Sequence, residues 1–279
     1  MEKARKNCEP ISGALENSYM GITVLMYHAI SKAKESNKYT LEEKDFQSHI
    51  EFLYTNNYKC ILVDEYYQSL LNPLLKISEK SVVITFDDGH ESNYTIALPL
   101  LKKYNFKAAF FITTDWIGKL GYMKPEHLRV LKAEGMSVQS HAKTHLFLDE
   151  MSFNEIQMEL AESKKNLENI LREKVSFLSF PGGRYNSNVI KCAKELGYLA
   201  FFSSLPFSIK RFGDAFLIGR YGMKYSFGEI NYEKLFQLKP IEKLLIKTAY
   251  YGKHFLKKVI GNNIYYYLWK RYFVEVKQR

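Results

Sequence analysis

Two acidic residues and two histidines follow apolar stretches in a pattern that suits a metal-dependent hydrolase. The run SVVITF (81–86) is typical of a buried strand and is followed at once by Asp87 and Asp88, although unpaired carboxylates are costly to bury. A second predicted strand is followed by His141 and His145. Carboxylate oxygen and neutral imidazole are ordinary ligands of zinc, and a neighbouring carboxylate can serve as general base. The pattern therefore predicts that one acid binds a metal while the other takes a proton from water.

Each part of this pattern also has a simpler interpretation. A lone Asp-Asp-Gly is usually a turn, and a lone HxxxH pair is a weak signal for a metal. Other histidines have no such context: His49 and His127 fall in predicted helices, and His90 is interpreted as a loop residue or a neighbour of the ligands. The joint pattern of acids and histidines at two strand ends is far more specific than either part.

Strands alternate with helices through residues 22–225, and these elements must position the site. The alternation is typical of a parallel α/β fold, and we predict a distorted (β/α) barrel of about seven strands. Sites in such barrels lie where the strands end at their carboxyl side. The polar residues expected at that rim are His28, Asp87, Asp88, His141, His145, the PGGRY segment 181–185 and Arg220.

Local patterns predict individual elements. KCILVDEY (59–66) is interpreted as a strand, and residues 31–40 as a polar loop. Ser152 and Glu155 form a capping box ahead of apolar residues at helical spacing, which predicts the start of a long helix.

Composition indicates an ordinary globular protein of 279 residues, with 46% hydrophobic and 25% charged residues. The three cysteines, Cys8, Cys60 and Cys192, form no CxxC pair, which favours a reducing compartment over a disulfide framework. Residues 1–20 are polar, show no signal-peptide pattern, and are expected to be mobile. We therefore expect a cytoplasmic protein.

Three motifs resemble those of a known family. TFDDG (85–89), SHAKTH (140–145) and SFPGGRYN (179–186) are similar to the successive motifs of the polysaccharide deacetylase, or NodB-homology, family. The resemblance covers roughly residues 20–225, and VLMYHAI (24–30) further resembles the poly-N-acetylglucosamine deacetylase branch. It implies a metal-dependent carbohydrate N-deacetylase that removes an N-acyl group, most simply N-acetyl, from an amino sugar in a glycan or lipid-linked precursor.

The resemblance also implies roles for individual residues. The metal would be Zn²⁺, with Co²⁺, Ni²⁺ and Mn²⁺ as alternatives. The implied roles are general base for Asp87, general acid for His28, metal ligands for Asp88, His141 and His145, and oxyanion or substrate binding for Pro181, Gly182, Arg184 and Tyr185.

The chain departs from the family pattern in three places. Ala142 stands where many members have Ser or Thr, and no Leu-x-His motif follows the last strand, so His28 is the best candidate for the acid. Ser179 stands where the family often has an arginine that pairs with the base. We predict that Arg220 or Arg184 supplies that charge instead.

The last segment, residues 237–279, differs in composition from the predicted barrel domain, residues 21–236. Net charge is +10, and residues 239–279 hold ten Lys or Arg against two Glu, among many aromatic residues. This mixture fits a helical tail that lies on the anionic inner face of a membrane. The alternative is a tail whose aromatic residues pack on the barrel. No nucleic-acid partner is expected. Alternative functions are a deformylase or cyclic amide hydrolase on the same scaffold, or a non-catalytic carbohydrate-binding relative.

Overall fold

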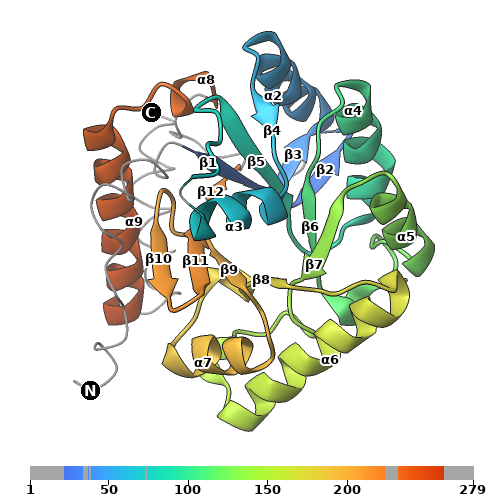
Figure 1. Ribbon diagram of the computed structural model, residues 1–279, viewed down its shortest axis with the longest axis vertical. Helices are drawn as coiled ribbons and strands as arrows, with labels where there is room; N and C mark the ends of the chain where they lie inside the picture. The colour runs from blue at the N-terminus through green and yellow to red at the C-terminus, as the bar shows by residue number, and fades with distance from the viewer. Residues whose placement is uncertain (1–21, 34–36, 38, 73, 224–231, 261–279) are drawn as a thin grey trace. The chain divides into compact units, whose positions relative to one another are not determined.

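A computed structural model describes residues 22–33, 37, 39–72, 74–223 and 232–260 (Figure 1). Contacts divide the chain between residues 236 and 237, so each part is described by itself. The predicted mobile segment 1–20 lies outside the described residues. The α/β class is confirmed, because helices surround a strongly curled, mixed sheet that forms a half-barrel.

The main sheet has ten strands in the described residues, in the order β10-β11-β9-β8-β7-β6-β5-β1-β12, with β4 also pairing with β5. Every pairing is parallel except that of β10 with β11. The strands are β1 (Thr23–Tyr27), β4 (Lys59–Cys60), β5 (Ser81–Phe86), β6 (Ala109–Ile112), β7 (Ser137–Ser140), β8 (Phe177–Ser179), β9 (Ala200–Ser203), β10 (Ile209–Phe212), β11 (Ala215–Gly219) and β12 (Tyr221–Gly222).

Consecutive strands β11 and β12 pair with distant members of the sheet. β11 pairs with β9 as far as Gly219 opposite Ser203, and β12 pairs with β1 from Tyr221 opposite Leu25. Arg220 is the single residue between them. The chain therefore passes from one side of the curled sheet to the other at Arg220, which places that side chain beside strands β1 and β5.

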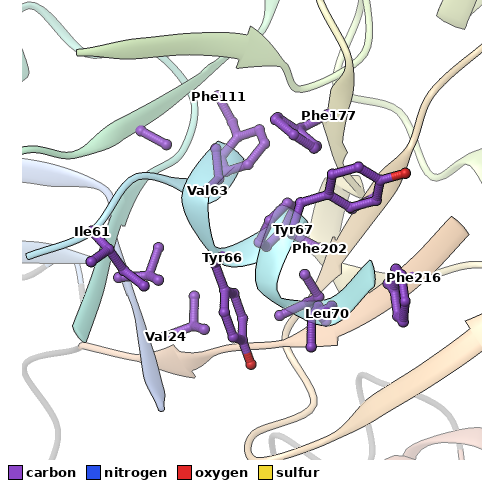
Figure 2. Packing of buried hydrophobic residues seen from close by; sticks show 14 residues of the cluster. Val24, Ile61, Val63, Tyr66, Tyr67, Leu70, Phe111, Phe177, Phe202 and Phe216 are labelled. Carbon is purple, nitrogen blue, oxygen red and sulfur yellow. The ribbon is translucent and has the colours of Figure 1, made fainter. Parts of the chain in front are cut away.

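Helix α3 (Val63–Leu71) fills the inside of the curl, where it packs against rings from β6, β8, β9 and β11 (Figure 2). The prediction of a strand over 59–66 is wrong, because only Lys59–Cys60 pairs with β5. Val63, Tyr66 and Leu70 repeat at helical spacing and are buried, so the apolar run continues into a helix.

Alternation along the strands places polar residues above this apolar layer. Side chains two apart on a strand share a face. Val83 and Phe177 belong to the buried cluster inside the curl, so Thr85 of β5 and Ser179 of β8 continue the same inner face. Asp87, the next residue in that period, and Arg220 are also buried. A small polar layer thus lies between the apolar interior and the rim.

Helices lie around the outside of the sheet (Figure 1). The predicted capping box of Ser152 and Glu155 is confirmed at the start of α6, because the Ser152 Oγ accepts from the Glu155 backbone N–H. Besides α3, the α-helices described in this part are α2 (Glu43–Thr55), α4 (Leu98–Lys103), α5 (Pro125–Ala133), α6 (Phe153–Leu171), α7 (Ser187–Glu195) and α8 (Tyr232–Leu235).

The segment predicted as a polar loop, residues 31–40, is bounded by two short strands. β2 (Ala29–Ser31) and β3 (Thr40–Glu42) pair in parallel as a separate two-stranded sheet. The prediction missed them because three-residue strands are too short to show alternation.

The second part contains helix α9 (Pro240–Ile260). It makes up most of the described portion of the predicted basic aromatic tail, and residues 261–279 lie outside the described residues. Within the part of the chain that the structure describes, no helix combines the length and apolar character needed to cross a membrane.

Candidate metal centre and its buried acid

The loops after β5 and β7 bring Asp88, His141 and His145 together. Oδ1 of Asp88 lies 3.4 Å from Nε2 of His141 and 3.3 Å from Nε2 of His145. One ligand atom from each residue lies within 4.8 Å of the others. Asp88 and His145 have left-handed backbones, with φ of 75° and 68°, which non-glycine residues adopt rarely and often at functional sites.

The donor set fits a divalent cation. Oδ1 of Asp88 is buried and has no hydrogen-bond partner among the described residues. Nδ1 of His141 lies 2.9 Å from the Ser179 carbonyl oxygen, so a proton there leaves Nε2 free as a ligand. Burial would raise the pKa of Asp88, but the imidazoles of His141, His145 and His90 around its carboxylate hold that pKa well below its ordinary value. These are the oxygen and nitrogen donors that zinc and similar ions take.

Asp87 lies in a different environment, paired with Arg220. The guanidinium makes two bonds to the carboxylate, Nη1 to Oδ1 at 2.7 Å and Nη2 to Oδ2 at 2.6 Å. Ser179 Oγ donates to Asp87 Oδ2 at 3.1 Å and accepts from Arg220 Nη2 at 2.7 Å, and Nη1 reaches Thr85 Oγ1 at 3.2 Å. Below it, the guanidinium lies 5.4 Å from the ring centre of Phe111.

This pairing keeps Asp87 ionised although it is almost fully buried. Burial would raise the pKa of the carboxyl, but the charge of Arg220, with that of His141, lowers the pKa below its ordinary value. Asp87 Oδ2 is 3.9 Å from Nε2 of His141, so the free acid borders the candidate metal ligands.

His28 lies between β1 and β2 at the same rim. Its ring centre is 4.9 Å from that of Tyr39, and its backbone oxygen accepts from Asn93 Nδ2 at 2.7 Å. Its Nδ1 is buried without a hydrogen-bond partner in the described residues. Burial lowers the pKa of His28 to about 4, although Asp88 and Asp87 act to raise it. The resting imidazole is therefore neutral near pH 7.

The PGGRY segment begins with a short 3₁₀ turn, Pro181–Gly183. Gly182 has a φ of 62°, and a Cβ there would approach Phe147 Cε1 to 2.7 Å, so any other residue would be strained and would displace the Phe147 ring. Its N–H lies in the first turn, where backbone donors have no acceptor within the helix. Tyr185 stacks on Phe180, with ring centres 5.5 Å apart.

Arg184 does not approach Asp87. Its Nε and Nη2 bond to Asp149 Oδ2 at 3.1 and 3.0 Å, and Nη2 also reaches Glu150 at 2.6 Å. Of the two arginines considered from the sequence, the structure thus places Arg220 against the acid. The signal available in the sequence was that Arg220 directly follows a predicted strand.

Two residues near the site were missed as participants, because Ser179 and Thr85 bond to the Arg220 pair. His90, interpreted from the sequence as a loop residue or a neighbour of the ligands, has its Nε2 3.3 Å from Asp88 Oδ2. The inward alternation of β5 and β8 could have identified Thr85 and Ser179. Beside His90 is a polar pocket of about 410 Å³, whose lining includes Ile30, Thr40, His90, Glu91, Ser92 and Thr95.

Comparison with known proteins identifies the family of this chain. A model of the family described as polysaccharide deacetylase matches residues 75–201, which include Asp87, Asp88, His141 and His145. YxkH of Bacillus subtilis, whose name assigns it to the polysaccharide deacetylases, is 35% identical over 190 residues, covering 68% of this chain and 67% of the relative. The chain therefore belongs to the polysaccharide deacetylase family, whose members are metal-dependent hydrolases of N-acetyl groups on amino-sugar polymers.

Two further relatives bear on the fold and substrate. The poly-β-1,6-N-acetyl-D-glucosamine N-deacetylase of Staphylococcus aureus is 27% identical over 189 residues, and the match spans 62% of this chain and 64% of that protein. The structure of the Streptococcus pyogenes deacetylase PplD, solved with acetate, has a TM-score of 0.70 at 26% identity and covers 78% of this chain and 98% of its own.

Proposed function

We propose that this protein hydrolyses the N-acetyl group of an amino sugar in a glycan polymer, using a divalent ion held by Asp88, His141 and His145. The observation that supports this best is a buried carboxylate oxygen, Asp88 Oδ1, that has no hydrogen-bond partner among the described residues and faces two imidazoles. An ionised acid, Asp87, lies directly beside it. A bound ion would supply Lewis-acid activation of the acyl carbonyl and of water.

The chain's own residues would handle the protons and the developing charge. Asp87 takes the proton of the attacking water, and Arg220 keeps that carboxylate oriented and ionised. The Gly182 N–H is the donor available for the oxyanion. His28 passes a proton to the departing amine, and because its resting pKa is about 4 it must first receive one, for which the proton that Asp87 takes from water is the source. The products are acetate and the free amine.

The substrate we propose is an N-acetylglucosamine polymer. The similarity to the staphylococcal deacetylase supports this class. So does the polar pocket next to His90, which could hold a sugar adjacent to the one being deacetylated. A cyclic amide hydrolase would need no room beyond the reacting group.

Acetate release from a substrate panel tests the proposal. We expect the metal-loaded enzyme to release acetate from β-1,6- or β-1,4-linked N-acetylglucosamine oligomers or from peptidoglycan fragments. Asp87→Asn should reduce the rate at least about 100-fold with metal content unchanged. Release of formate alone from N-formyl sugars would support the deformylase alternative. If the protein retains no divalent metal and hydrolyses none of these substrates, the result would support the alternative of a non-catalytic carbohydrate-binding relative.

We also propose that α9 rests on an anionic membrane, at the inner face of the membrane, where a lipid-linked precursor would be available. Ile241, Leu244 and Leu245 are each more than half exposed and share one side of the helix, with lysines nearby. In vesicle flotation, the full chain with all three changed to Ser should lose binding to vesicles that contain phosphatidylserine. Exposed Leu74 and Leu120, changed to Ser together, provide the control. Equal flotation of both variants would contradict the proposal.

A further inference from the structure

The two carboxylate oxygens of Asp88 face different partners. Oδ1 points to Nε2 of His141 and of His145, at 3.4 and 3.3 Å. Oδ2 lies 3.3 Å from Nε2 of His90, a residue that the predicted ligand set does not include. The carboxylate is therefore divided, with one oxygen toward the metal position and the other toward a third imidazole.

His90 is itself fixed by the segment 118–123. Its backbone forms an antiparallel bridge with Tyr122, and its ring stacks on the Tyr122 ring, with centres 5.0 Å apart and planes at 22°. The backbone bonds from Met123 N–H to the Gly89 carbonyl and from Glu91 N–H to the Gly121 carbonyl hold the two segments together on either side. The imidazole thus has little freedom to leave Asp88.

The same aromatic contacts continue to a second ligand. The Trp116 ring lies 4.9 Å from Tyr122 and stacks on His145 at 5.0 Å, with planes at 30°. A continuous set of rings, from His90 through Tyr122 and Trp116 to His145, therefore begins against one metal ligand and ends against another. Asp88 and His145 are also the two ligands with left-handed backbones.

We propose that His90 is a positioning residue for the metal centre: with its proton on Nε2, it donates to Asp88 Oδ2 and so keeps Oδ1 directed at the metal position. The terminal torsion of an aspartate is broad and two-fold, so without a partner the carboxylate would sample other orientations. Hydrogen bonds to ligating groups commonly determine metal affinity in this way. The inference rests on the proposed function only in taking Asp88, His141 and His145 as the ligands.

The test is the affinity of the metal-free full chain for Zn²⁺ and Co²⁺, measured by competition with a chromophoric chelator. His90→Ala should weaken binding about 10- to 100-fold, whereas His90→Gln, which keeps an N–H donor, should recover most of it. His127→Ala is the matched control, because His127 also stacks on a tyrosine, Tyr94 at 4.1 Å, but has no contact with the ligand cluster. Its metal affinity should equal that of the unchanged protein.

The outcomes separate this inference from the proposed function. An unchanged protein that binds neither ion would contradict the metal centre itself. If the unchanged protein binds and His90→Ala binds equally well, His90 does not position Asp88. If His90→Gln is as weak as His90→Ala, the residue acts as a fourth ligand or through stacking, and the hydrogen-bond role is wrong. Melting of the metal-free variants should match that of the unchanged protein, which separates a loss of metal affinity from unfolding.

Discussion

Asp87 and Asp88 are adjacent in the chain, but they belong to two different kinds of structure. Asp87 lies over the inside of the curled sheet, where Arg220, Ser179 and Thr85 complete a closed set of hydrogen bonds. Asp88 turns away on a left-handed backbone toward histidines from a loop, and one of its buried oxygens has no hydrogen-bond partner in the described residues.

The difference shows how a strand end can hold two acids with separate tasks. The Asp87 side is complete without any ligand and is built on strands, so its parts should stabilise the fold. The Asp88 side gathers three potential ligands on loops and would be completed by a cation, so its parts should affect metal binding far more than folding.

The largest expected effect is a loss of stability on the Asp87 side, called the closed side below because its hydrogen bonds are complete. Arg220→Met would leave the Asp87 carboxylate buried without its partner, and we expect a loss of about 3–5 kcal/mol in the free energy of unfolding. Urea unfolding followed by circular dichroism measures it. Arg184→Met, which removes a partly exposed pair with Asp149, should cost no more than about 1 kcal/mol.

A second change makes that result specific to the pair. Arg220→Met combined with Asp87→Asn removes the unpaired charge as well, so it should recover part of the lost stability while remaining inactive. If Arg220→Met unfolds at the same urea concentration as the unchanged protein, the closed side contributes nothing to the fold and the comparison fails.

On the Asp88 side, the open side, a substitution should affect metal binding. Asn tolerates a left-handed backbone, so Asp88→Asn preserves the local shape while removing the charge. We expect a loss of metal affinity of more than about 100-fold, since even outer partners of ligands are worth about 10- to 100-fold. The metal-free protein should unfold within about 1 kcal/mol of the unchanged protein. Isothermal titration with Zn²⁺ and urea unfolding give the two numbers, and a large stability loss with intact binding would reverse the comparison.

Sequence patterns could predict the metal side better than the closed side. Asp88, His141 and His145 follow strands in positions that the α/β alternation brings to one rim, and their residue types identify the chemistry. For the partner of Asp87, the sequence could narrow the choice only to two arginines, Arg220 and Arg184. The choice between them depends on how the chain passes between β11 and β12. That passage is a long-range pairing that local periodicity does not encode.

The error over residues 59–66 also arises from packing between distant parts of the chain. Residues 59–66 contain an apolar run whose length suits either a buried strand or a helix, and the space inside the curled sheet selects the helix α3. Ser179 was seen only as a departure from the family pattern. Its hydroxyl in fact bonds both members of the Asp87–Arg220 pair.

Mild acid should affect the fold through buried histidines before it affects the closed side. Burial lowers the pKa of His49 to about 4, whereas Asp87 stays ionised to below its ordinary pKa. As pH falls, His49 binds a proton at a higher pH in the unfolded chain than in the folded chain. Stability is therefore lost as pH falls from about 6.5 to 4, and it is fully present above that range.

The His49 ring stacks on the Tyr232 ring, with centres 3.8 Å apart. His49→Phe keeps a ring in that place and removes the titration of the imidazole. Between pH 7 and 5 the variant should lose about 2 kcal/mol less stability than the unchanged protein. Urea unfolding at several pH values measures the difference. His127→Phe is the control, and an equal slope for His49→Phe and the unchanged protein would show that His49 is not held neutral.

The smallest expected effect comes from Ser179→Ala, which removes one bridging hydroxyl and leaves both Asp87–Arg220 bonds in place. We expect a cost of about 1–2 kcal/mol in unfolding, typical of a buried hydrogen bond to charged groups. The rate of acetate release should fall less than about 10-fold with KM unchanged, because Ser179 is fully buried and acts only through the orientation of Asp87. Ser69→Ala, another buried serine, should leave that rate unchanged. A rate loss as large as that of Asp87→Asn would mean that the arginine alone does not hold the acid, and that the closed side depends on its hydroxyl as much as on its charge.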